Sequence, residues 1–138
     1  MFGIPRPGVH AYRQMSVDTD VLAASPHQLI TLLFDGALRS IDTAVAQINS
    51  ADIEGKGRSI TKAIEIVGGG LAASLDMKKG GELAVQLASL YDFVVRQLVD
   101  ANIGNDTTKL GEARKVLSQM RQNWVDMGAA TTAQGVAA

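Results

Sequence analysis

Hydrophobic residues recur at alternating steps of three and four residues in four segments of this 138-residue chain. This spacing places them on one side of an α-helix, so each segment is predicted to form an amphipathic helix. The predicted helices span residues 26–49, 53–75, 82–102 and 107–127. Their apolar stripes are Ile30, Phe34, Ala37, Ile41, Ala44 and Ile48; Ile60, Ala63, Ile64, Val67, Leu71 and Leu75; Ala84, Leu87, Tyr91, Val94, Leu98 and Ala101; and Leu110, Ala113, Leu117, Met120, Trp124 and Met127.

Short connections between four long helices favour an all-α fold, an antiparallel up-down four-helix bundle. The bundle is predicted to occupy residues 25–128, after an N-terminal arm or short extra helix at residues 1–24. Pro5 and Pro7 disfavour a helix at the start of that arm. The small, uncharged residues 129–138 show no periodicity, and we expect a disordered tail there.

Several residues mark the predicted helix ends. Ser25 and Gln28 have the spacing of a capping box at the start of the first helix. Asp106 is a good N-cap for the fourth helix. Gly104 and Gly128 fit positions just past the ends of the third and fourth helices, where glycine commonly terminates a helix.

Three consecutive glycines, residues 68–70, interrupt the second helical pattern. Each glycine inside a helix costs about 0.5–1 kcal/mol relative to alanine. The sequence therefore leaves three alternatives for this helix: it bends at the glycines, another helix approaches closely there, or it ends early.

The third predicted helix is more apolar than a bundle helix requires. Its polar residues between positions 83 and 99 fall within an arc of about 140° at 100° per residue. Beyond its core stripe this helix carries further apolar residues, namely Val85, Ala88, Val95 and Val99, and the first helix has a similar surplus in Leu29, Leu32 and Leu33. Either neighbouring elements, including the arm, bury this surplus, or it forms a groove for an amphipathic helix of a partner. Both hold if the arm lies in the groove until a partner displaces it.

The arm itself offers three apolar anchors, Val9, Tyr12 and Val17. The Tyr12 ring can fill an apolar pocket while its hydroxyl reaches a polar rim. The alternative is an ordinary tyrosine on a mobile terminus.

Composition narrows the function further. The chain has no cysteine and a net charge of −1, with no dense basic run, so thiol chemistry and nucleic-acid binding are not expected. Neither a signal peptide nor a membrane span is apparent. The two histidines, His10 and His27, lack metal-ligand spacing, and His27 is expected to be solvated or to cap its helix. We therefore expect no metal site, no cofactor and no enzymatic activity.

Several short motifs, each different from the others, lie in order along residues 11–127. It begins at Ala11-Tyr12-Arg13-Gln14-Met15-Ser16-Val17 and Ala24-Ser25-Pro26-His27-Gln28-Leu29-Ile30. It continues through Lys62-Ala63-Ile64-Glu65-Ile66, Ser74-Leu75-Asp76, Lys79-Gly80-Gly81-Glu82, Leu90-Tyr91-Asp92-Phe93, Ala101-Asn102 and Asn105-Asp106, and ends with Trp124. In this order and spacing the chain resembles the FliS family of flagellar export chaperones. The triple glycine and the first ten residues depart from the family pattern.

The resemblance implies a cytoplasmic chaperone that captures the C-terminal segment of flagellin, which is disordered in the free subunit. Capture prevents premature polymerisation and keeps the subunit ready for the flagellar type III export gate, whose components are further candidate partners. The candidate partner-binding residues are Val9, Tyr12, Val17, Leu29, Leu33, Leu90, Tyr91 and Val94. The alternative is a helical adaptor that binds another amphipathic helix in the same groove.

Overall fold

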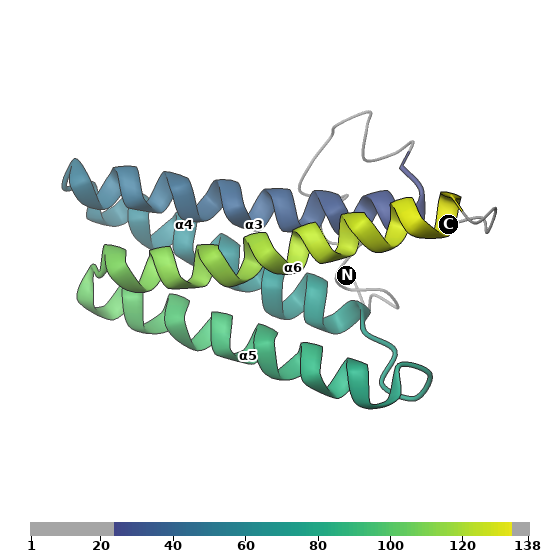
Figure 1. The fold of residues 1–138 in the computed structure, drawn as a ribbon. Coiled ribbons are helices and arrows are strands. Elements are labelled where there is room, and N and C mark those ends of the chain that lie inside the picture. The colour runs from purple at the N-terminus through teal and green to yellow at the C-terminus, as the bar shows by residue number, and fades with distance from the viewer. Residues whose placement is uncertain (1–23, 134–138) are drawn as a thin grey trace, which may run out of the picture.

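The structure, a computed structural model, describes residues 24–133, with side chains up to residue 128. Four α-helices make up this part of the chain: α3 (Pro26–Asn49), α4 (Ile53–Ile66), α5 (Gly81–Gly104) and α6 (Thr107–Ala133). No strand is present within these residues. Successive helices run in alternating directions (Figure 1), and α3 and α5 each pack against both α4 and α6. The predicted all-α bundle is confirmed.

The core lies where the four predicted stripes meet. Its largest fully buried side chains are Phe34, Leu33, Ile41, Ile60, Leu71, Leu98, Leu110, Leu117, Val67 and Val94. The rings of Phe34 and Tyr91 join α3 to α5, with centroids 6.4 Å apart. Because each buried aliphatic or aromatic side chain contributes about 1.5–3 kcal/mol, this core is the main source of the bundle's stability.

Side chains cap the helices largely as predicted. Ser25 accepts a hydrogen bond from the backbone N–H of Gln28, whose side chain accepts one from Ser25, so the capping box is confirmed. Asp106 accepts from the N–H of Thr108 (2.9 Å) at the start of α6. The end of α5 differs from the prediction, because Gly104 is still helical and Asn105 takes the left-handed conformation with φ 51°. Asparagine tolerates this conformation well enough to end a helix.

The triple glycine changes the type of helix without ending the helical path. The α-helical part of the second segment ends at Ile66, a π-helical turn (η1, Val67–Leu71) follows, and a 3₁₀ turn (η2, Ala72–Ser74) completes it. A Cβ on Gly70 would stand 3.3 Å from Cδ2 of Leu33, whereas one on Gly69 would meet nothing within 4 Å. Close approach of α3 therefore accounts for Gly70 only.

The fourth helix is longer than predicted. It passes through Gly128 and reaches Ala133, so the expected end at residue 127 is wrong. Gly128 lies against the His27 ring, which a Cβ would overlap, so this glycine permits close packing between α6 and α3. Residues 1–23 of the predicted arm (1–24) and the last five residues of the predicted tail, 134–138, lie outside the described residues.

Candidate partner-binding surface

The seam between α3 and α6 is closed by polar contacts within the chain. Arg121 Nε donates to Asp35 Oδ1 (2.6 Å), and Arg114 binds both carboxylate oxygens of Asp42 at 2.7 and 3.2 Å. The hydrogen bond to Asp42, together with its negative charge, raises the pKa of the Arg114 guanidinium. These four charged groups of the seam are therefore paired within the chain.

One end of the same seam is held by a reciprocal contact between His27 and Trp124. Their rings stack with centroids 4.5 Å apart and planes 9° from parallel. His27 Nε2 donates to the Trp124 carbonyl oxygen (2.9 Å), and Trp124 Nε1 donates to the His27 carbonyl oxygen (3.0 Å). The expectation of a solvated or capping His27 is therefore wrong, since its ring fastens α3 to α6.

The helix α5, in contrast, exposes apolar side chains along its length. Those at least two-fifths exposed are Leu83, Val85, Leu90, Phe93, Val99 and Ile103. The predicted surplus is thus exposed at Val85 and Val99, while Ala88 and Val95 are half-buried. Sequence reasoning missed Phe93 because it lies within the polar arc, and Ile103 because it follows the last predicted core position.

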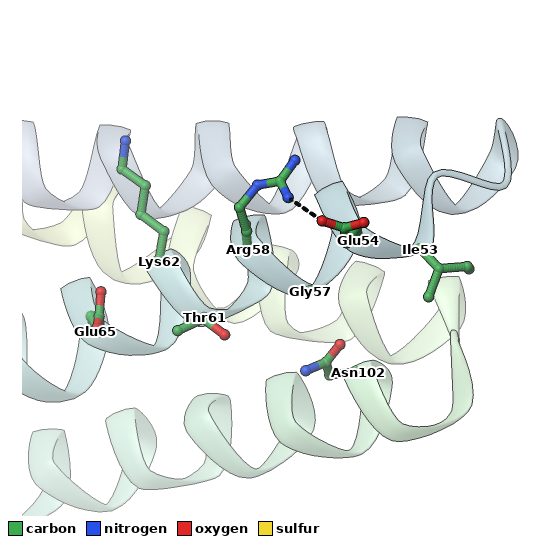
Figure 2. A pocket seen from close by; sticks show the side chains of 8 residues that line it. All are labelled: Ile53, Glu54, Gly57, Arg58, Thr61, Lys62, Glu65 and Asn102. Carbon is green, nitrogen blue, oxygen red and sulfur yellow. Dashed lines mark ion pairs between the residues drawn. The ribbon is translucent and has the colours of Figure 1, made fainter.

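A hollow lies along α4 and reaches α5 at Asn102. An open hollow of about 630 Å³ is lined by α4 residues and Asn102 of α5, namely Ile53, Glu54, Gly57, Arg58, Thr61, Lys62, Glu65 and Asn102. Figure 2 shows Thr61 and Asn102 between the two helices, whereas Arg58 and Lys62 point to the other side of α4. We call the residues that line this hollow, together with Val99 and Ile103 of α5, the α4–α5 face. On α5, Val99, Asn102 and Ile103 lie within about 100° of one another, at 100° per residue.

A charged side chain is buried where the start of α4 packs against the end of α5. Lys56 of α4 is 5% exposed, and its Nζ donates to the carbonyl oxygen (2.9 Å) and to Oδ1 (2.8 Å) of Asn102. The contact ties the first turns of α4 to the last turn of α5. The lysine gave no sequence signal, because a charged residue near a helix start is usually solvated.

The opposite side of α5 faces α6, as the hydrogen bond between Gln97 and Glu112 shows. Leu83 and Leu90 are exposed at 55% and 41%, and helical periodicity places both on the Gln97 side. These two side chains form an apolar patch that is distinct from the α4–α5 face.

The structure separates the sequence-predicted partner residues into three groups. Leu90 is exposed, as stated, whereas the other four bundle residues, Leu29, Leu33, Tyr91 and Val94, are buried to 6% exposure or less. A partner reaches those four side chains only if the bundle opens. The arm residues, Val9, Tyr12 and Val17, lie outside the described residues. A partner-binding role for all eight stays a prediction.

Burial has a clear electrostatic effect at one of these residues. Desolvation raises the pKa of the Tyr91 hydroxyl to about 12. Within residues 24–128, no group of three or more histidine or acidic side chains has the arrangement of a metal site. No helix among the described residues is both long enough and apolar enough to cross a bilayer.

The protein is thus an all-α bundle with one seam fastened by polar contacts and with exposed apolar side chains along α5. Residues 8–131 match the family described as Flagellar protein FliS. The chain is 44% identical over 117 residues to the flagellar secretion chaperone FliS of Salmonella typhimurium, covering 85% of this chain and 87% of that protein. It is 41% identical over 113 residues to FliSB of Pseudomonas aeruginosa (82% and 89%) and 33% over 114 residues to FliS of Bacillus subtilis (83% and 80%). The chain therefore belongs to the FliS family of flagellar secretion chaperones.

Proposed function

We propose that this chain binds the C-terminal segment of flagellin in the cytosol. Bound flagellin is kept from polymerising and is handed in an unfolded form to the flagellar type III export gate, whose components are further proposed partners. Membership of a chaperone family supports a binding role without catalysis or a cofactor. The single observation that carries the proposal is the exposed apolar surface of α5.

The physical case rests on the cost of ordering a disordered segment. Fixing each residue costs roughly 1–2 kcal/mol of backbone entropy, so a captured segment must bury a large apolar area in return. Val85, Val99 and Ile103 lie toward α4, and Leu83 and Leu90 lie toward α6. An amphipathic helix laid along either side of α5 removes these side chains from water.

The proposal includes a role for the N-terminal arm. Val9, Tyr12 and Val17 are proposed to cover part of the apolar surface until flagellin displaces them. A second hollow at the α3–α6 end is lined by Ala24, His27, Gln28, Thr31, Leu32, Arg121 and Val125. This hollow includes Ala24, where the arm joins the bundle, and so it supports an arm that folds back against this end of the bundle.

Calorimetric titration with the C-terminal segment of the same organism's flagellin tests this function. The full chain is expected to bind one segment per molecule, and the chain lacking residues 1–17 is expected to bind more tightly. Equal affinity of the two chains discards the covering arm and keeps the chaperone function. Absence of binding by both chains, with helical folding shown by circular dichroism, overturns the flagellin assignment and favours an adaptor for another helix.

A further inference from the structure

The ammonium group of Lys56 is a buried positive charge at the contact between α4 and α5. Among the described residues, no carboxylate lies within ion-pair distance of its ammonium group. A buried cation without an opposite charge is costly unless hydrogen bonds replace its water. Asn102 supplies them from the last turn of α5, where unpaired carbonyl groups carry the negative end of the helix dipole.

This contact also fixes which way the Asn102 amide points. An ammonium group only donates hydrogen bonds, so the amide oxygen must face Lys56 and the amide nitrogen must face away. Figure 2 shows the nitrogen on the Thr61 side, and Asn102 lines the hollow of the α4–α5 face. No side chain or backbone group within residues 24–128 accepts a hydrogen bond from Nδ2 of Asn102.

We infer that Asn102, oriented by Lys56, is a polar recognition residue of the α4–α5 face. Its Nδ2 donates a hydrogen bond to a backbone carbonyl of the bound flagellin segment, whose apolar side chains contact the neighbouring Val99 and Ile103. This inference rests on the proposed function. The carbonyl groups left unpaired at the end of a partner helix are the acceptors best suited to this donor. One fixed donor amid apolar contacts sets the register of the segment, because a shift leaves the donor unpaired.

The substitution Asn102→Asp separates recognition from a purely structural role. Aspartate keeps an oxygen facing Lys56 and adds an opposite charge, but it replaces the donor nitrogen with an acceptor oxygen. The free energy of unfolding, measured in urea, is expected to stay equal or rise. The affinity for the flagellin segment is expected to fall at least about tenfold, the size of effect seen when a buried group loses its hydrogen-bond partner. Asn123→Asp, on the exposed side of α6, is the matched control for the change in net charge.

A second measurement needs no substitution in the protein that binds. The Asn102 side-chain amide signals in a ¹H–¹⁵N spectrum of the full chain, identified by their absence in Asn102→Asp, are expected to shift when the segment binds. The Asn123 amide signals are expected to stay in place.

The outcomes separate this inference from the function on which it rests. Binding of the segment by the wild-type chain, with unchanged affinity for Asn102→Asp or unshifted Asn102 amide signals, overturns the role of Asn102 alone. A wild-type chain that does not bind the segment overturns the proposed function and this inference with it.

Discussion

The α3–α6 seam and the α4–α5 face differ in how far their side chains are covered. Between α3 and α6, two carboxylates pair with guanidinium groups, and His27 and Trp124 exchange hydrogen bonds, so these polar side chains have partners within the chain. On the α4–α5 face, Val99 and Ile103 remain exposed beside an open hollow. The difference agrees with the proposal that the α3–α6 seam holds the bundle together and that the α4–α5 face is available for a partner.

The largest expected effect comes from breaking the fastened seam. Trp124→Ala removes the stacked ring and its hydrogen bond, and should lower the free energy of unfolding by about 3 kcal/mol. Urea unfolding followed by circular dichroism measures this loss. Met127→Ala, at a position of the same helix that is 53% exposed, is the control and should change the value by less than about 0.5 kcal/mol. Equal effects of the two substitutions contradict a special role for this seam.

The stability of the protein at high pH tests whether Tyr91, on the core side of α5, is buried as described. The hydroxyl of Tyr91 has a pKa of about 12 in the folded protein and about 10 when unfolded. Because the folded state holds this proton more tightly, its stabilising contribution is complete below pH 10 and is lost as the pH rises towards 12. The wild-type protein should therefore lose about 2 kcal/mol more than Tyr91→Phe across this range, measured by urea unfolding at each pH. Parallel curves for the two proteins refute a buried, titrating Tyr91.

Substitutions on α5 test whether the α4–α5 face binds the flagellin segment. Replacing Val99 and Ile103 together with glutamine, which is neutral and favours helix, should weaken flagellin binding at least about tenfold through lost apolar contact. The free energy of unfolding should change by no more than about 0.5 kcal/mol. Leu90→Gln tests the side facing α6 and should have a smaller effect, and Met127→Gln should have none. Strong loss with Leu90→Gln alone would place the segment on the α6 side.

The smallest expected effect distinguishes two neighbouring glycines. Gly69→Ala should stabilise the protein by about 0.5 kcal/mol, because the new Cβ meets nothing and the unfolded chain loses freedom. Gly70→Ala should bring no gain, since its Cβ would crowd Leu33 of α3 at 3.3 Å. Thermal unfolding of the two variants measures the contrast. An equal gain for both would show that α3 does not approach η1 as closely as described.

Much of the fold follows from local sequence patterns. The stripes of three and four residues predict the four helices and most of the core, and the capping residues Ser25 and Asp106 predict two helix starts. The ends of α5 and α6 were mispredicted because Asn105 and Gly128 act through backbone conformation and a distant ring. That ring belongs to His27, which lies 97 positions from Trp124 along the chain, so no local pattern reveals the contact.

The candidate site is less predictable for a physical reason. Periodicity shows that α5 is too apolar for one core stripe, but it does not show which neighbour covers each side. The structure therefore places Leu33, Tyr91 and Val94 in the core, and exposes Ile103, which the pattern did not single out. Burial of Lys56 under Asn102 likewise depends on the packing of α4 against α5.

Photo-cross-linking tests the central claim most directly. A cross-linking side chain is placed at position 103 in one full-length protein and at position 122, an exposed site on α6, in another. After mixing with the flagellin C-terminal segment, position 103 should yield a covalent product and position 122 should not. A complex that forms in solution but cross-links only through position 122 would contradict the assignment of the α4–α5 face as the binding surface.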